Sequence, residues 1–151
     1  MEIVYFNEQS NFHVKAERLF LTHKQRIEEL IPGADVQHVG STAIPDSLTK
    51  GDLDIQVRVP ADQFKQAIQA LSSCYERNDG SDETDCFRAY KDDATDPPLG
   101  VQLTIIHSEM DFFWKFRDVL NGNKSYRDQY DKLKQQYNGA DMEDGSVKKF
   151  V

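Results

Sequence analysis

The pattern of apolar residues predicts two helices in the first half of the chain. A first helix covers about 12–31, where apolar side chains recur every three or four residues, and Pro32-Gly33 ends it. A second covers roughly 61–73, directly after Pro60, a residue that favours the first helical turn. The apolar faces carry Phe12, Ala16, Leu19, Phe20, Ile27, Leu30 and Ile31 in the first helix, and Phe64, Ala67, Ile68 and Leu71 in the second. Each helix therefore has one side with which to pack on a sheet.

Two further helices are predicted towards the C-terminus. Each opens at a serine that is followed three positions later by an acid, Asp111 after Ser108 and Asp128 after Ser125, as in a capping box. The side chains aligned on their inner faces are Phe113, Phe116 and Leu120 in the first, and Tyr126, Tyr130, Leu133 and Tyr137 in the second. Gly139 is expected to end the last helix.

Alternating or short apolar runs predict the strands. They cover 34–39, 52–58, 87–91 and 101–106, while residues 2–6 fit either a short strand or an entry segment, and 75–85 reads as a polar connection. The order of elements predicts an α/β (α+β) fold, with a mixed β-sheet, helices packed on it and two C-terminal helices. A length of 151 residues fits a single domain, 1–151.

Asp52 and Asp54 are the first candidate for chemistry. Two positions apart on a strand, their carboxylates project from one face about 7 Å apart, while Leu53 and Ile55 point into the core. Two converging carboxylates suit a hard cation such as Mg²⁺, which takes oxygen ligands. Taken alone, the pair fits the solvated face of an amphipathic strand better than a metal site.

The Gly40-Ser41 pair at the end of the preceding strand adds a candidate phosphate site. A glycine there lets the backbone approach a ligand, and the Ser41 and Thr42 hydroxyls can donate to phosphate oxygens or to a bound water. Lys50 could neutralise a phosphate, and His38 could orient Ser41 or a phosphate. Each also has a structural interpretation: a serine-capped turn, a solvated loop lysine, and a strand histidine with satisfied hydrogen bonds.

The composite pattern resembles a known family. The stretch His38-Val39-Gly40-Ser41-Thr42-Ala43-Ile44-Pro45, followed by Lys50 and by Asp52-Leu53-Asp54-Ile55, is similar to the signature of the GrpB-like family, within the nucleotidyltransferase superfamily of the polymerase-beta-like fold. Phe116-Arg117-Asp118 and residues 130–134 extend the resemblance over most of 35–137.

The resemblance implies a reaction. A Mg²⁺-dependent enzyme of this type moves a nucleoside monophosphate from a nucleoside triphosphate to an acceptor, here an unknown small molecule or protein. Gly40 and Ser41 would then hold the triphosphate, and Asp52 and Asp54 would be the catalytic metal ligands. The alternatives are a non-catalytic nucleotide- or phosphate-binding module on the same fold, and a protein-interaction module whose acidic surface meets a basic partner.

One part of the superfamily pattern is missing. A third carboxylate belongs on a later strand, which here is 101–106, and the GrpB-like family commonly has His-Leu-His on that strand. Gln102 and Thr104 share a face there, and neither is acidic. Candidate substitutes just beyond are His107, Glu109 and Asp111, and further candidate phosphate contacts are Arg88 and Lys91. Glu109 and Asp111 fit the start of a helix better than a catalytic role.

Charge and composition narrow the partners. A net charge of -8 argues against nucleic acid, but it leaves room for a small phosphorylated ligand held through a divalent cation. No run of about 20 apolar residues predicts a membrane span, and the N-terminal segment does not resemble a secretory signal. Cys74 and Cys86 read as two reduced thiols, which favours a cytoplasmic protein.

Overall fold

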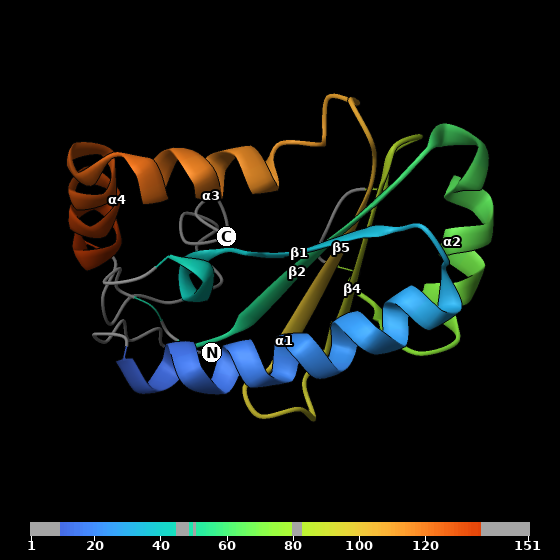
Figure 1. The fold of residues 1–151 in the computed structure, drawn as a ribbon, viewed down its shortest axis with the longest axis horizontal. Coiled ribbons are helices and arrows are strands. Elements are labelled where there is room, and N and C mark those ends of the chain that lie inside the picture. Colours follow the sequence, from blue (N-terminus) through green and yellow to red (C-terminus); the bar gives the residue numbers. More distant parts are fainter. Residues whose placement is uncertain (1–9, 45–48, 50, 80–82, 137–151) are drawn as a thin grey trace.

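The computed structural model describes residues 10–44, 49, 51–79 and 83–136 (Figure 1). The elements in chain order are α1 Ser10–Leu30, β1 Asp35–Val39, the 3₁₀ turn η1 Ser41–Ala43, β2 Leu53–Val59, the 3₁₀ turn η2 Ala61–Gln63, α2 Phe64–Ser72, β3 Glu76–Arg77, β4 Phe87–Asp92, β5 Leu99–Ile105, α3 Phe113–Gly122 and α4 Lys124–Gln136. The possible strand 2–6 and the predicted helix end at Gly139 lie outside the described residues.

The strands form one mixed sheet in the order β1-β2-β5-β4-β3. β2 and β5 run parallel, and the other neighbours are antiparallel. In this register Asp54 of β2 lies opposite Val39 on one side and Gly100 on the other. A mixed sheet with helices packed on it and two C-terminal helices confirms the predicted fold class.

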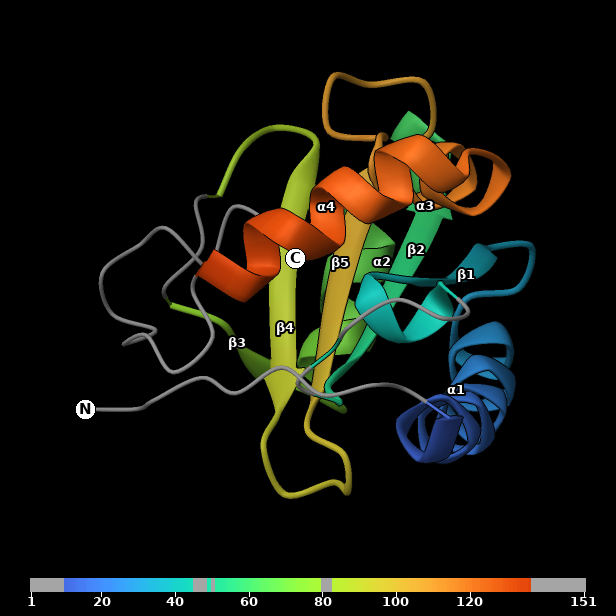
Figure 2. The same ribbon diagram turned by 90° about the vertical axis from the view of Figure 1, so that its left-hand side faces the viewer.

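The main core lies between the sheet and the first two helices. In Figure 2, α4 crosses in front of β4 and β5, whereas α2 lies behind them. The side chains of β2 that face α1 and α2 are Leu53, Ile55, Val57 and Val59, each at 0% exposure. Full burial of one such aliphatic side chain contributes about 1.5–3 kcal/mol to stability. The alternation seen in the sequence therefore places this side of β2 in the core.

The other face of the sheet is polar. Asp54, Gln56 and Arg58 alternate with the core residues and point towards the side covered by α3 and α4. A smaller apolar cluster of Ile44, Leu120 and Tyr130 packs the two C-terminal helices against the turn after β1. The candidate site thus lies between a sheet and a helical hairpin.

The predicted start of α3 is wrong, whereas α4 begins within one residue of the predicted Ser125. α3 begins at Phe113 rather than Ser108, because Asp111 is only 2% exposed and accepts hydrogen bonds from the sheet instead of capping a helix. α4 begins at Lys124, where Asn123 Oδ1 accepts a hydrogen bond from the Tyr126 N–H over 3.1 Å. A local capping pattern cannot report a distant partner, and that is why it failed at α3.

Some predicted burials are also wrong. Phe116 and Tyr126, expected on inner helix faces, are 46% and 51% exposed, and Leu30 is 38% exposed. Leu120 and Tyr130 are buried as expected. The segment 75–85 also contains the short strand β3, which pairs with β4.

Two smaller expectations concern membranes and thiols. Across residues 10–44, 51–79 and 83–136, none of the helices combines the length and hydrophobicity that a membrane span needs. Cys74 and Cys86 are both free thiols, as expected.

Candidate functional site

The Gly40 backbone lies directly against the Asp54 carboxylate. Gly40 ends β1 with φ 75° and ψ -174°, a conformation that residues with a Cβ rarely adopt. A Cβ at this position would lie 2.5 Å from Asp54 Oδ2. The Gly-Ser turn and the acidic strand, which the sequence singled out separately, are therefore in contact.

A second glycine borders the same carboxylate from β5. Gly100 pairs with Asp54, and a Cβ on Gly100 would lie 3.0 Å from Asp54 Oδ1. Asp54 is half-buried between these two strands, and Asp52, also half-buried, comes directly before β2. Because Gly40 and Gly100 have no side chains, the Asp54 carboxylate can lie close to both backbones.

The Ser41 and Thr42 hydroxyls hold the turn together. Ser41 Oγ is hydrogen-bonded to Thr49 Oγ1 over 2.5 Å, and Thr49 Oγ1 accepts the Gly51 N–H over 3.0 Å. Thr42 is 2% exposed, and its hydroxyl donates to the Asp52 carbonyl over 3.1 Å. Both hydroxyls thus connect the turn to the start of the acidic strand. Lys50 lies outside the described residues.

His38 supports this arrangement from behind the sheet. Its Nε2 is 2.9 Å from Thr42 Oγ1, its Nδ1 is 2.8 Å from Glu17 Oε2, and its ring stacks on Phe20. Burial lowers the pKa of His38, and the hydrogen bond and charge of Glu17 oppose that effect only in part. His38 contacts Thr42 rather than Ser41, as the structural interpretation of a strand histidine expects.

α1 contributes two residues that the sequence analysis missed. His13 Nδ1 is 2.5 Å from the Thr42 carbonyl oxygen, and Glu17, four positions later, holds His38. A spacing of four puts both side chains on one face of α1. The sequence signal that could have revealed them is a pair of polar residues, His13 and Glu17, on the otherwise apolar side of a helix.

The strand that should carry a third carboxylate carries Gln102 and Thr104 instead. Thr104 is fully buried and accepts a hydrogen bond from Gln56 Nε2 over 3.0 Å. A Cβ added to Gly100 would lie 3.2 Å from Gln102 Nε2 and 3.0 Å from Asp54 Oδ1. The Gln102 amide nitrogen and the Asp54 carboxylate therefore both lie beside Gly100. Gln102 Oε1 is buried and has no hydrogen-bond partner among the described residues.

These donors fit a cation only in part. In the described part of the chain, no group of three His, Cys, Asp or Glu side chains could hold a metal ion. The carboxylate oxygens of Asp52 and Asp54 are nevertheless of the kind that Mg²⁺ takes, whereas the Gln102 atom that lies beside Gly100 is its amide nitrogen. Asp52 and Asp54 would hold the ion.

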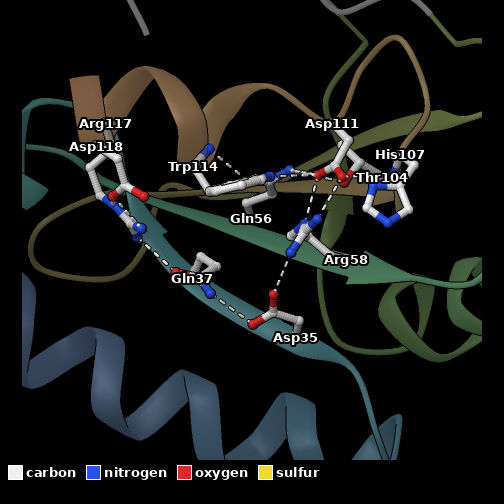
Figure 3. A network of polar contacts seen from close by, with 10 residues as sticks. All are labelled: Asp35, Gln37, Gln56, Arg58, Thr104, His107, Asp111, Trp114, Arg117 and Asp118. Atoms are coloured by element: carbon white, nitrogen blue, oxygen red, sulfur yellow. Dashed lines mark hydrogen bonds and ion pairs between the residues drawn. The ribbon is translucent and has the colours of Figure 1, made fainter. Parts of the chain in front are cut away.

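Asp111 is part of a separate buried network (Figure 3). Its carboxylate accepts hydrogen bonds from Arg58 Nε and Nη2, each over 2.7 Å, and from the His107 N–H over 2.8 Å. Gln56 Nε2 and Trp114 Nε1 donate to the same carboxylate over 3.0 and 3.2 Å. Burial alone would raise the pKa of Asp111, but these hydrogen bonds and the Arg58 charge lower it overall.

This network lies at the other end of β2 from the candidate site. Arg58 is four residues beyond Asp54, roughly 13 Å along a strand. His107 and Glu109 are exposed beyond the same end of β5. None of the three suggested substitutes for the missing carboxylate therefore lies beside Asp54, and Asp111 is a structural acceptor.

Of the two further candidate cations, one lies on the site face. Lys91 of β4 pairs with Gly100, so it shares a row with Asp54 two strands away, and its Nζ is 3.1 Å from Asp93 Oδ2. Arg88 lies on the opposite face, over the Phe64 ring of α2. Arg88 therefore cannot reach a ligand at Gly40.

Comparisons with known proteins agree with this fold. The model of the family described as "GrpB protein" matches residues 11–149. A UPF0157 protein of Vibrio cholerae serotype O1 is 28% identical over 148 residues, covering 95% of this chain and 77% of that protein.

Solved structures show the same likeness. The crystal structure of the conserved protein GrpB from Enterococcus faecalis matches with a TM-score of 0.67 at 18% identity, over 87% of this chain and 81% of that one. The MgGTP-bound Cid1 poly(U) polymerase matches with a TM-score of 0.57 at 12% identity, over 85% of this chain and 42% of that one, which shows the fold alone. The chain belongs to the GrpB protein family and has a nucleotidyltransferase-like fold.

Proposed function

We propose that this protein binds a nucleoside triphosphate with Mg²⁺ and transfers its nucleotidyl group to a small molecule or a protein. The observation that supports this most is the Asp54 carboxylate, which lies between the backbones of Gly40 and Gly100 with no side chain on either. A carboxylate bordered by a Gly-Ser turn brings a cation ligand and a phosphate-sized approach to the same place. The net charge of -8 disfavours the binding of a nucleic acid as the acceptor.

The chain's own residues would have three tasks. The Gly40 backbone admits the phosphates, the Ser41 hydroxyl can donate to one of their oxygens, and the Asp52 and Asp54 carboxylates would hold the metal. When bound, Mg²⁺ neutralises phosphate charge and orients the attacking and leaving oxygens. An acceptor hydroxyl oxygen would attack the α-phosphorus in line and give its proton to water, the bond from that phosphorus to the bridging oxygen would break, and pyrophosphate would leave.

A second candidate is binding without transfer, and Gln102 favours it. An amide cannot take the acceptor's proton, and it adds no negative charge to the metal site. In this case the protein would bind Mg²⁺ and nucleotide saturably and release no pyrophosphate.

One experiment tests both candidates. Calorimetric titration of ATP, GTP, CTP and UTP, each with and without Mg²⁺, is compared between the wild type and Asp54→Asn, with Asp62→Asn as the control. Asp62 is exposed in η2, beyond the far end of β2, so its substitution makes the same charge change away from the site. We expect Mg²⁺-dependent binding that Asp54→Asn loses and Asp62→Asn keeps; no binding of any nucleotide would contradict the proposal.

Pyrophosphate release then separates the two candidates. The wild type is incubated with Mg²⁺, the tightest-binding nucleotide and pools of small-molecule or protein acceptors, and pyrophosphate is measured. Release that depends on Asp54 supports transfer. Tight binding with no release from any pool supports the binding module.

A further inference from the structure

A buried threonine beside the Gly-Ser turn has no role in the function proposed above. Thr49 is 0% exposed. Its hydroxyl oxygen accepts the Gly51 N–H over 3.0 Å and lies 2.5 Å from Ser41 Oγ. Because Gly51 comes directly before Asp52, Thr49 connects the serine of the turn with the start of the acidic strand.

The direction of the hydrogen bond between Thr49 and Ser41 follows from the number of protons. A hydroxyl can donate one hydrogen bond and accept two, whereas a backbone N–H can only donate. Gly51 therefore fills one acceptor position of Thr49 Oγ1. If Ser41 donated as well, the buried Thr49 proton would have no acceptor among the described residues, and a buried donor without a partner is costly. Thr49 is thus the donor, and Ser41 Oγ accepts.

This direction leaves the Ser41 proton available. Ser41 is half-buried beside Gly40, and in the described part of the chain its hydroxyl has Thr49 as its partner. Thr42 differs, because its hydroxyl already donates to the Asp52 carbonyl over 3.1 Å. Of the two hydroxyls of the turn, that of Ser41 can therefore donate to a ligand without giving up a bond. A hydroxyl that accepts a hydrogen bond is also a stronger donor, since neighbouring hydrogen bonds polarise one another.

We propose that Thr49 is a positioning residue, whose hydroxyl donates to Ser41 Oγ and turns the Ser41 proton towards a phosphate oxygen of the ligand. The proposal rests on the proposed function, because it places a phosphate at the Gly40-Ser41 turn. Since Thr49 is fully buried, it acts through Ser41 and not on the ligand itself. The Gly51 N–H holds the other side of the Thr49 oxygen, so the backbone next to Asp52 fixes the direction of the Ser41 proton.

The test measures the binding of inorganic tripolyphosphate with Mg²⁺ by calorimetry. Thr49→Val keeps the shape of the side chain but removes the hydroxyl, and Thr49→Ser keeps the hydroxyl. We expect Ser41→Ala and Thr49→Val each to weaken binding about tenfold, because a hydrogen bond to a charged oxygen is lost or misdirected. Thr49→Ser should stay within about twofold of the wild type. Thr104→Val is the control and should not change binding, since Thr104 is equally buried but lies opposite Arg58, at the far end of β2.

A double variant distinguishes positioning from a general support of the turn. Ser41→Ala combined with Thr49→Val should bind tripolyphosphate as Ser41→Ala alone does, because the effects of residues that act through one group are not additive. A further loss on adding Thr49→Val, or a Thr49→Ser variant as weak as Thr49→Val, would overturn the proposal. Urea unfolding of each variant ensures that binding is compared between folded proteins.

A ligand-free measurement separates this proposal from the proposed function. A buried, hydrogen-bonded hydroxyl proton exchanges slowly with water, so it can be observed by NMR. We expect such a proton on Thr49, with a nuclear Overhauser effect to the Ser41 side chain; a slowly exchanging proton on Ser41 instead would overturn the proposal. The Thr49 proton in a protein that binds neither tripolyphosphate nor ATP with Mg²⁺ would support the hydrogen bond and contradict the nucleotidyl-transfer function. Binding of both ligands that Thr49→Val leaves unchanged would contradict the positioning role alone.

Discussion

Arg58 of β2 donates two hydrogen bonds of 2.7 Å to the carboxylate of Asp111, which is 2% exposed. The Arg58 guanidinium also lies over the Trp114 ring, 4.8 Å from its centroid, and Gln56 Oε1 accepts the Trp114 N–H at the start of α3 over 3.0 Å (Figure 3). Gln56 and Arg58, two polar residues of β2, thus hold the start of α3.

Removing the buried carboxylate should therefore be costly. We expect Asp111→Ala to destabilise the fold by about 3–5 kcal/mol, because it leaves the Arg58 charge buried without its main partner. Asp128→Ala, which breaks the exposed pair with Lys124 on α4, should cost less than about 1 kcal/mol. Urea unfolding of both variants measures the difference, and similar losses in the two would show that the Asp111 network is not a support of the fold.

Gly40 should tolerate no side chain. Gly40→Ala combines an unfavourable φ with a Cβ 2.5 Å from Asp54 Oδ2. It should therefore remove nucleotide binding and lower the free energy of unfolding more than the replacement of a glycine in an open turn does. Gly33→Ala is the matched control, because Gly33 has φ 86° and nothing within 4 Å of its Cβ. That control should lose only the backbone term, about 1–2 kcal/mol, and should keep binding. Equal stability losses, with binding retained in both variants, would contradict the close contact.

Buried histidines should make the fold sensitive to mild acid. Burial lowers the pKa of both His38 and His23, the latter hydrogen-bonded to the Tyr75 hydroxyl over 2.7 Å. Between the lowered folded pKa and the unfolded value of about 6.5, the unfolded state binds more protons, so stability rises with pH. The free energy of unfolding should fall as the pH drops through about 6.5 and should level off below the folded pKa values.

Replacing one of these histidines tests the cause. Urea titrations at several pH values between 7.5 and 5 should show a shallower decline in His23→Gln than in the wild type. The control variant measured beside it is His107→Gln, the same substitution at an exposed histidine. A His23→Gln slope equal to that of the wild type would rule out its burial as a source of the acid sensitivity.

Gln102 should decide how strongly the site holds a metal. Gln102→Glu would place a third carboxylate near Asp54, and we expect it to tighten Mg²⁺ binding in the presence of ATP by about tenfold or more. Gln66→Glu makes the same change on the exposed side of α2 and should have no effect. Calorimetry with Mg²⁺ measures both, and weaker metal binding in Gln102→Glu would contradict the location of the site.

Local patterns predicted what local forces determine. The alternation in β2 and the glycine at the end of β1 were enough to bring Asp54 and Gly40 into consideration together, because strand periodicity and a positive φ act over a few residues. Asp111 was misread as a helix cap because its partner Arg58 is 53 residues away in the sequence. A Ser-x-x-Asp pattern is the same whether the acid caps a helix or meets a buried arginine.

The exposure of Phe116 was missed for a related reason. Helical spacing placed Phe116 on an inner face, but spacing does not say what occupies the opposite side. In the structure the apolar cluster of Ile44, Leu120 and Tyr130 fills the inner face of the hairpin, and Phe116 remains at its edge. Only the packing of α3 and α4 against the turn reveals which rings stay exposed.

The central claim is that a metal-nucleotide complex binds between Gly40 and Gly100. The most direct test adds Mn²⁺ in place of Mg²⁺, with ATP, to the ¹⁵N-labelled protein and follows paramagnetic broadening of the backbone amide signals. We predict strong broadening of the Gly40 and Gly100 amides, which Asp54→Asn abolishes, and little effect at Gly33, about 20 Å away beyond the far end of β1. Unbroadened Gly40 and Gly100 signals at saturating Mn²⁺-ATP would contradict the claim.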